Sequence, residues 1–264
     1  MPYEVKDINL ADEGEKQIEW AASRMKSLMK IKKQFEKKKP LKGIKVGMAL
    51  HITKETANLV KTLKSGGAEV AITGCNPLST QDEVAAALAK QGFNVYGWKG
   101  ETKKEYYENL EKVADFKPNI TIDDGCDLVN LIHNKKPELI DNIYGGAEET
   151  TTGIIRLKAM QKDKALKYPM IAVNESKTKK MFDNHFGTGQ STLDGIIRST
   201  NILFAGKTVV VCGYGNCGSG VAEKAKGLGA LVIVTEVDPV KALQARMDGF
   251  RVMPINKASK KGDV

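Results

Sequence analysis

The stretch KTVVVCGYGNCGSGVAEKAKGLGALVIVTEVD, Lys207–Asp238, decides the fold of the second half of this chain. Its first residues, Lys207–Cys212, form a short β-branched run that is typical of a buried parallel strand. A glycine-rich G-x-G-x-x-G loop follows, and after it come a helical segment and a second strand, Leu231–Thr235. This order of elements predicts a dinucleotide-binding α/β unit.

The three glycines of this loop have different physical roles. Gly213 permits the tight turn, Gly215 lets the backbone approach a pyrophosphate, and Gly218 lets the helix pack closely on the strand. The helix N-terminus then offers unpaired N–H groups to phosphates. Glu236 ends the second strand, where a carboxylate accepts hydrogen bonds from an adenosine ribose and repels a 2′-phosphate. The loop therefore predicts NAD binding in preference to a purely structural turn.

The composition is that of an ordinary soluble globular chain. Of its 264 residues, 41% are hydrophobic and 28% are charged, which is enough material for two domains or one large one. The net charge of +9 raises the question of nucleic acid, but most basic residues are interleaved with acids. Only Lys30–Lys39 is densely basic, and its single aromatic residue, Phe35, is not the aromatic interleaving that would stack on bases. We interpret that run as a solvated helix end and expect no nucleic-acid partner.

The four cysteines form no C-x-x-C pair, and two of them lie at the glycine-rich loop. This spacing argues against a disulfide framework and against a zinc site, so we expect no metal and a reducing compartment. The N-terminus lacks the apolar core of a signal peptide, and no apolar run reaches membrane-spanning length. We therefore expect a cytoplasmic protein with no membrane partner.

Short strand candidates alternate with helical stretches from Gly43 onward, after an amphipathic helix predicted from apolar positions between Ile18 and Met29. The strand candidates are Ile44–Leu50, Val70–Thr73, Asn94–Tyr96, Asn119–Ile122, Leu139–Tyr144 and Met170–Val173. The helical candidates are Glu55–Ser65, Gln81–Gln91, Lys103–Ala114, Cys126–Asn134 and Thr151–Lys162. Such alternation predicts a mostly parallel, doubly wound sheet of the α/β class.

Polar side chains follow several of these strands, at the edge where parallel sheets bind ligands. They are His51 and Thr53 after the first strand, Asn76–Asp82 after the second, Asp123 and Asp124 after the fourth, and Glu148–Thr152 after the fifth. Each could by itself be a helix cap or a turn residue. Their gathering at one edge favours a binding site.

Six motifs in this order closely resemble the S-adenosylhomocysteine hydrolase family. They are HITKET, CNPLSTQD, DDG, EETTTG, the segment NESKTKKMFDNHFGTGQS at Asn174–Ser191, and GYGNCGSG. The resemblance implies two doubly wound, Rossmann-like domains: a substrate-binding domain over 1–185 and the first half only of an NAD-binding domain over 186–264. It also implies a homo-tetramer with tightly held NAD that acts on a nucleoside thioether in the methylation cycle of one-carbon metabolism.

The chemistry implied by this resemblance is the reversible hydrolysis of S-adenosylhomocysteine to adenosine and homocysteine. Transient oxidation of the ribose 3′ carbon by NAD makes the neighbouring 4′ proton acidic, so that homocysteine leaves by β-elimination before water adds. The cycle needs groups for the 3′ hydroxyl proton, for the 4′ proton and for the leaving sulfur.

The resemblance carries functional roles to particular residues of this chain. Lys179 and Asp183 fall on the 3′ side, Asp124 and Glu149 lie beside the ribose, and His51 lies near the 5′ position. These five are the implied catalytic residues and, apart from His51, also substrate contacts. Thr53 and Glu55 match purine contacts, where a carboxylate favours adenine over an oxo-purine. The implied NAD contacts are Thr150, Thr151, Thr152, Asn184, Gly213, Gly215, Asn216, Cys217, Gly218, Ser219, Gly220, Glu236 and Lys241.

His133 and His185 match no functional position, and we interpret both as structural. The chain also departs from the family at several positions. Thr188 replaces a usual cysteine, Lys241 replaces a common asparagine, and three loop residues differ while the glycines are kept: Asn216, Cys217 and Ser219.

After Glu236 only one more strand candidate, Phe250–Met253, precedes Val264, whereas the family continues well beyond. Two interpretations therefore stay open. The chain is the N-terminal portion of such a hydrolase, and is expected to be inactive alone, or it is a non-catalytic relative or fragment that binds nucleoside, NAD or partner subunits without turnover. A generic NAD-dependent dehydrogenase fits less well, because EETTTG and K-x-x-x-DN belong to the hydrolase pattern.

Overall fold

The computed structural model describes residues 2–264, which divide into two compact units, Met1–Asn174 and Glu175–Val264. The sequence analysis placed the domain boundary between 185 and 186. In the structure, the segment 175–185 belongs to the second compact unit. Both units are parallel α/β structures, as the sequence predicted. Each is described by itself.

The first unit is built on a seven-stranded parallel sheet with the order β1-β4-β3-β2-β5-β6-β7. The strands are β1 (Tyr3–Glu4), β2 (Lys45–Ala49), β3 (Glu69–Thr73), β4 (Asn94–Tyr96), β5 (Ile120–Asp123), β6 (Gly145–Glu148) and β7 (Met170–Ala172). The central strands are almost wholly buried, which explains their continuous apolar runs. The order reverses beside β2, so β2, β3 and β5 bring their carboxyl ends together.

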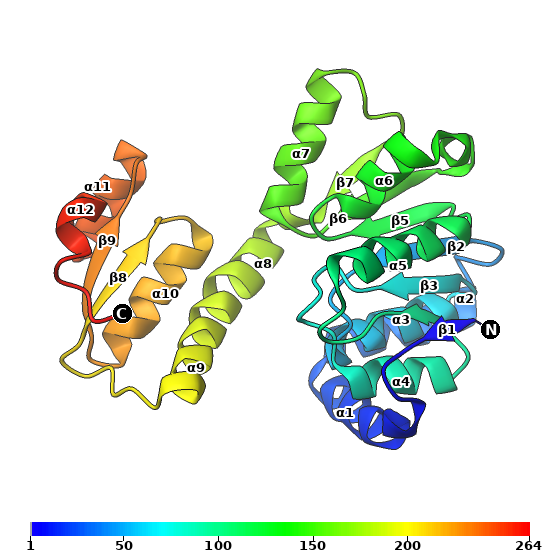
Figure 1. Ribbon diagram of the computed structural model, residues 1–264, viewed down its shortest axis with the longest axis horizontal. Coiled ribbons are helices and arrows are strands. Elements are labelled where there is room, and N and C mark those ends of the chain that lie inside the picture. The colour runs from blue at the N-terminus through cyan, green and yellow to red at the C-terminus, as the bar shows by residue number, and fades with distance from the viewer. Residues whose placement is uncertain (1) are drawn as a thin grey trace. The chain divides into compact units, whose positions relative to one another are not determined.

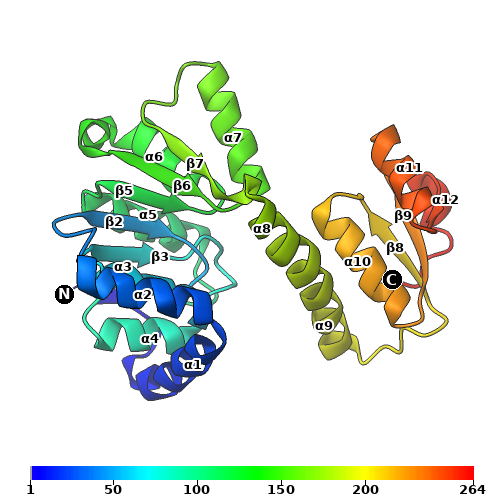
Figure 2. The same cartoon turned by 180° about the vertical axis from the view of Figure 1, so that it is seen from behind.

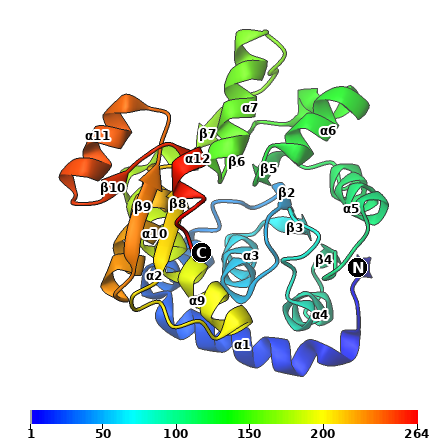
Figure 3. The same cartoon turned by 60° about the vertical axis from the view of Figure 1, so that its left-hand side comes forward.

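Helices cover both faces of this sheet. They are α1 (Ala11–Arg24), α2 (Lys26–Lys38), α3 (Lys54–Ser65), α4 (Asp82–Lys90), α5 (Lys103–Asp115), α6 (Asp127–Lys135) and α7 (Thr151–Lys162), with 3₁₀ turns η1 (Ile8–Leu10), η2 (Pro137–Asn142) and η3 (Val173–Glu175). One apolar core joins α1, α3 and α4 to one face, and a second joins α5, α6 and α7 to the other. Figure 1 shows α5 and α6 in front of the sheet, and Figure 2 shows α2 and α3 from behind. Figure 3 shows the strands between the two layers.

Two local expectations were wrong. The segment Leu139–Tyr144 was expected to be a strand, but Pro137 begins the 3₁₀ turn η2 there, and its apolar residues Leu139 and Ile143 point into the core. The fifth predicted strand is instead β6, just downstream. The N-terminal amphipathic helix is also not continuous, because the backbone at Met25 (φ −94°, ψ 53°) separates α1 from α2.

The second unit carries a three-stranded parallel sheet with the order β10-β9-β8. Its strands are β8 (Thr208–Cys212), β9 (Leu231–Thr235) and β10 (Arg251–Val252). Its helices are α8 (Lys177–Lys179), the π-helix η4 (Lys180–Gly187), α9 (Thr188–Thr200), α10 (Asn216–Gly227), α11 (Pro239–Met247) and α12 (Ile255–Ala258). Leu193 of α9 and Ala222 of α10 pack with β8 and β9 in one apolar core. The backbone at Asp263 and Val264 runs along β8, where the Val210 N–H donates to the Val264 carbonyl at 2.8 Å.

Candidate functional site

Three strand ends of the first unit bring together an imidazole, a thiol and a carboxylate. His51 follows β2, Cys75 follows β3 and Asp124 follows β5. The His51 Nε2 atom lies 3.4 Å from Asp124 Oδ2, and the Cys75 thiol donates to the same oxygen at 3.6 Å. The Asp124 side chain is 14% exposed and that of His51 is 46% exposed. The predicted residues His51 and Asp124 therefore lie side by side at the carboxyl edge of the sheet.

The loop after β3 holds this group in place. Ser79 Oγ lies 2.6 Å from His51 Nδ1, and Gln81 Oε1 accepts the Lys54 N–H at 2.9 Å. The Tyr106 hydroxyl contacts the Cys75 carbonyl at 3.3 Å. The Ser79 contact fixes the imidazole, the Gln81 contact joins this loop to α3, and the Tyr106 contact fixes the backbone of Cys75.

Two buried carboxylates shape the neighbouring loops. Asp123 accepts the N–H groups of Asp124 (3.0 Å) and Val129 (2.9 Å). Glu148 accepts the N–H groups of Gly125 (2.8 Å), Cys126 (3.1 Å) and Thr150 (3.0 Å). Burial raises the pKa of Asp123 to about 8, against its backbone hydrogen bonds and with the help of the nearby Glu148 charge. Burial likewise raises the pKa of Glu148.

These carboxylates position two predicted functional segments. Asp124 follows Asp123 directly, and the Glu149 N–H donates to the Asp123 carbonyl at 2.9 Å, so Asp124 and Glu149 lie on adjacent strand ends. Thr150 is the N-cap residue of α7. Thr151 Oγ1 accepts a hydrogen bond from Asn174 Nδ2 at 2.8 Å, and Thr151 and Thr152 are exposed in the first turn of α7.

The two predicted purine contacts lie at the start of α3. Thr53 is the N-cap of this helix and accepts the Thr56 N–H at 3.4 Å. The Glu55 side chain is 50% exposed, and its carboxylate lies 3.4 Å from the Lys54 ammonium. The helix start therefore offers an acceptor and a cation beside each other, four residues from His51.

The K-x-x-x-DN segment of the second unit forms a compact polar cluster. Ser176 caps the short helix α8, and the chain continues as the π-helix η4, a form that is often found at functional sites. The Lys179 ammonium lies 3.1 Å from Asp183 Oδ2 and donates to Asn184 Oδ1 at 3.1 Å. The Lys179 side chain is only 12% exposed, whereas that of Asp183 is 63% exposed.

This segment is attached to the helix that follows the glycine-rich loop. Asn184 Nδ2 contacts Cys217 Sγ at 3.6 Å. The His185 ring contacts Ser219 Oγ at 3.1 Å and Glu223 Oε2 at 3.0 Å, and its structural role stays a prediction. Gly220 permits the close approach, since a Cβ there would lie 2.0 Å from the His185 carbonyl oxygen.

The glycine-rich loop has the geometry that its pattern predicts. Gly213 has φ +100° and donates to the Thr235 carbonyl at 2.7 Å. A Cβ on Gly218 would lie 2.1 Å from the Gly213 carbonyl oxygen, so this close turn requires glycine. Gly215 is the N-cap of the twelve-residue helix α10, and a Cβ there would meet nothing within 4 Å. Asn216 then begins α10, with its carbonyl accepting from Ser219 Oγ at 3.1 Å. The open space at Gly215 fits a phosphate group at the helix N-terminus.

Glu236 is turned toward the backbone. It accepts the Tyr214 N–H at 2.7 Å, the Val237 N–H at 2.7 Å and the Asp238 N–H at 3.0 Å. These hydrogen bonds lower the pKa of Glu236. The carboxylate therefore joins the end of β9 to the glycine-rich loop. In the next helix, the Lys241 ammonium lies 3.7 Å from the Asp238 carboxylate.

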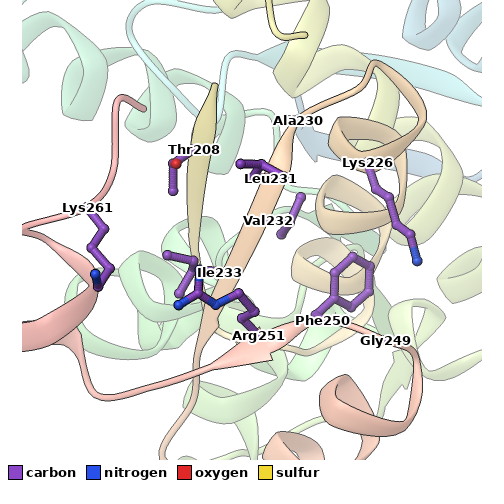
Figure 4. Close-up of a pocket in the computed structure, with 10 residues that line it drawn as sticks. All are labelled: Thr208, Lys226, Ala230, Leu231, Val232, Ile233, Gly249, Phe250, Arg251 and Lys261. Carbon is purple, nitrogen blue, oxygen red and sulfur yellow. The ribbon is translucent and has the colours of Figure 1, made fainter. Parts of the chain in front are cut away.

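A pocket of about 510 Å³ in the second unit does not coincide with these residues (Figure 4). It lies at the amino ends of β8 and β9, whose first residues Thr208 and Leu231 line it together with Phe250 and Arg251. Parallel α/β sheets bind ligands at their carboxyl ends. We therefore place the candidate nucleotide site at the glycine-rich loop and not in this pocket.

Sequence reasoning missed one member of the first site, Cys75, whose thiol contacts Asp124. The one available signal was its position just after a strand end. Ser79 and Glu148 lay within the polar segments that the sequence placed at this edge, and the structure adds their contacts with His51 and with the neighbouring loops. Within residues 2–264, no helix combines the length and apolar character needed to cross a bilayer.

Two family profiles match this sequence. Residues 2–139 match the S-adenosyl-L-homocysteine hydrolase profile, and residues 184–264 match the NAD binding domain profile of the same hydrolase. NAD is accordingly the cofactor that the second match implies, and the open loop at Gly215 fits it.

Curated relatives align along nearly the whole chain. It is 65% identical over 262 residues to the S-inosyl-L-homocysteine hydrolase of Methanocaldococcus jannaschii and 60% identical over 264 residues to that of Methanothermobacter thermautotrophicus. It is 61% identical over 265 residues to the adenosylhomocysteinase of Saccharolobus solfataricus. The alignments cover 99%, 100% and 100% of this chain, and the chain spans 63% of the length of each relative.

Proposed function

The chain belongs to the S-adenosyl-L-homocysteine hydrolase family, and from that premise we propose that it reversibly hydrolyses S-adenosylhomocysteine to adenosine and homocysteine. One observation carries the proposal most directly. The lysine–aspartate pair Lys179 and Asp183 is tied through Asn184 to the first turn of α10, beside the glycine-rich loop. A proton-handling pair next to the cofactor loop suits oxidation of an alcohol, in which a proton and a hydride leave together.

The roles of the two units follow from this reaction. The first unit would bind the nucleoside thioether at its sheet edge, and the second would bind NAD; the domains are 1–185 and 186–264 by sequence. NAD, when bound, supplies a reversible hydride acceptor for the ribose 3′ carbon. Thr150–Thr152 and Lys241 are proposed as further NAD contacts, together with the glycine-rich loop and Glu236.

Three of the five proposed catalytic residues then handle one proton each. Lys179, oriented by Asp183 and Asn184, takes the proton of the 3′ hydroxyl. Asp124 acts as base on the 4′ hydrogen, with Glu149 beside the ribose on the adjacent strand end. His51 lies 3.4 Å from Asp124 and can protonate the departing sulfur.

The test of these roles uses a protein of full family length that contains this chain, isolated with its bound NAD, because the N-terminal portion of a hydrolase is expected to be inactive alone. Adding adenosine should convert bound NAD⁺ to NADH, which is followed by absorbance. Lys179→Ala should abolish this conversion, whereas Lys180→Ala, which removes only the ion pair with Glu175, should retain it. Reduction at the parent rate in Lys179→Ala would refute the assignment. A parent protein that neither reduces NAD nor releases homocysteine would favour the alternative, a non-catalytic relative or fragment that binds without turnover.

The purine is the least constrained part of the substrate. Glu55 can accept a hydrogen bond from the amino group of adenine, which supports S-adenosylhomocysteine. S-inosyl-L-homocysteine is a second candidate, because two of the three relatives above bear that name and because Lys54 places a donor beside the carboxylate. Comparing kcat/KM for the two thioethers decides between them, and a Glu55→Gln variant should lose preference for the adenine form if Glu55 reads the amino group.

We also propose a cytoplasmic homo-tetramer of the methylation cycle, without nucleic-acid or membrane partners. Four free thiols support a reducing compartment. Light scattering coupled to size exclusion should give the mass of four chains. A monomer that is fully active would contradict the tetramer.

A further inference from the structure

The cluster His51, Cys75 and Asp124 has the composition and geometry of a transition-metal site. Its three potential ligand atoms all lie within 4.8 Å of one another. Imidazole nitrogen, thiolate sulfur and carboxylate oxygen are the ligand types that zinc uses in proteins. The spacing of cysteines in the sequence did not indicate such a site, since the three residues come from different strand ends.

Two of the three ligand separations fit tetrahedral coordination. Zinc bonds of about 2.0 Å to nitrogen or oxygen and about 2.3 Å to sulfur imply tetrahedral edges of about 3.3 Å for N···O and about 3.5 Å for S···O or S···N. The first two separations are 3.4 Å between His51 Nε2 and Asp124 Oδ2 and 3.6 Å between Cys75 Sγ and Asp124 Oδ2, which match within about 0.1 Å. The third, between the His51 ring and Cys75 Sγ, is within 4.8 Å, and rotation of the two side chains would bring it to the tetrahedral edge.

The hydrogen bonds around His51 orient the lone pair of its Nε2 atom toward Asp124. The Ser79 hydroxyl lies 3.2 Å from the Asn76 carbonyl and 2.6 Å from His51 Nδ1, and it accepts from Nδ1 in the tautomer that carries the ring proton there. In the neutral ring this tautomer leaves Nε2 as a lone pair that faces a carboxylate oxygen. Two electron-pair donors at 3.4 Å repel unless a proton or a cation lies between them.

Each ligand is also held from behind, as metal ligands usually are. Ser79 holds His51, Tyr106 contacts the Cys75 carbonyl, and the Asp123 carboxylate accepts the Asp124 N–H. A preorganised set of this kind needs little rearrangement to bind an ion.

We propose that His51, Cys75 and Asp124 bind one zinc-like divalent cation, which leaves a fourth coordination position open. Since Asp124 is a proposed substrate contact and His51 a proposed catalytic residue, the bound ion would exclude the nucleoside and inhibit turnover reversibly. The cation site itself depends on the three side chains and not on the proposed reaction.

Binding of the ion requires the thiolate. Metal uptake must therefore release the thiol proton, and the affinity should rise with pH.

The experiment titrates the chain with Zn²⁺ by calorimetry and with Co²⁺ by absorbance. We expect one ion per chain, and with Co²⁺ a thiolate-to-metal charge-transfer band together with the intense visible bands of tetrahedral coordination. Cys75→Ser should remove the charge-transfer band and weaken Zn²⁺ binding by at least the factor of about 10 to 100 that the loss of an outer-shell partner costs. Cys212→Ser, which changes an exposed thiol elsewhere, should bind like the parent.

Two results would overturn the proposal. One is a parent protein whose Co²⁺ spectrum lacks the thiolate band, and the other is a Cys75→Ser variant that binds Zn²⁺ as tightly as the parent. The parent spectrum decides even if the variant folds poorly. Both readouts are independent of catalysis, so their failure is distinct from a failure of the proposed hydrolase activity.

Discussion

Replacing Gly153 by alanine is expected to damage the first unit through a single carboxylate. Gly153 lies in α7 behind β6. A Cβ at this position would lie 2.1 Å from both Cδ and Oε1 of Glu148 and 2.6 Å from Oε2. Ordinary contact begins at about 3.5 Å, so the carboxylate must retreat by about 1.4 Å. It has little room to do so, because Glu148 is completely buried.

The size of the effect follows from the hydrogen bonds that this retreat breaks. Glu148 accepts three backbone N–H groups at 2.8, 3.1 and 3.0 Å. Loss of two of these charge-assisted bonds costs about 4 kcal/mol, and the better helix propensity of alanine returns about 1 kcal/mol. We expect a net loss of about 3 kcal/mol from the first unit, which lowers its Tm by about 6 to 12 °C.

Thermal unfolding and amide hydrogen exchange measure the two consequences. The Gly125, Cys126 and Thr150 amides should lose protection in Gly153→Ala, since Glu148 no longer accepts from them. Gly195→Ala is the matched control: its Cβ would meet nothing within 4 Å on α9, so it should stabilise the second unit by about 0.5 to 1 kcal/mol. Unchanged protection of those three amides with an unchanged Tm would show that Glu148 does not hold the two loops.

Two further predictions concern pH. Burial raises the folded-state pKa of Asp123 to about 8, so the stability that its protonated form contributes is complete below the ordinary carboxyl pKa and is lost as pH rises through 8. Urea unfolding across this pH range should show the free energy of unfolding falling as pH rises. Asp123→Asn should make that free energy less dependent on pH. The pH dependence is opposite for Glu236, because backbone hydrogen bonds lower its pKa. The stability that its carboxylate contributes is present above the ordinary carboxyl pKa and is lost as pH falls through the lowered pKa. Acid unfolding of the second unit should therefore occur at higher pH in Glu236→Gln. Identical pH profiles in parent and variant would refute either statement.

The sequence predicted the parallel sheets well where local signals agreed with burial. β3, β8 and β9 were recognisable because most of their residues are apolar and β-branched, in short runs bounded by turns. β6 was not, because its sequence GGAE contradicts strand propensity. A Cβ on Gly146 would lie 2.3 Å from Thr121 Oγ1 and 2.6 Å from Met170 Sδ, so packing between two close neighbours selects glycine there. A packing constraint of this kind cannot be recognised from the neighbouring residues in the sequence.

The candidate site was predictable to a similar degree. His51 and Asp124 could be placed at one edge because strand ends of a parallel sheet meet there. The part played by Cys75 could not be seen, since it depends on a contact across 49 residues of sequence. Glu236 was expected to face a ribose, and its hydrogen bonds to three backbone N–H groups only become visible once β9 and the glycine-rich loop are side by side.

The π-helix η4 makes the winding of its segment critical. A π-turn holds one residue more than an α-turn, and Lys179 and Asn184 are five residues apart, which is the spacing of one π-turn. Each residue of an α-helix turns the chain by about 100°, so ordinary α-helical winding of the same residues would rotate the Lys179 ammonium about 140° away from Asn184. The polar cluster therefore depends on the π-helical winding of 180–187 as well as on the residue types within it.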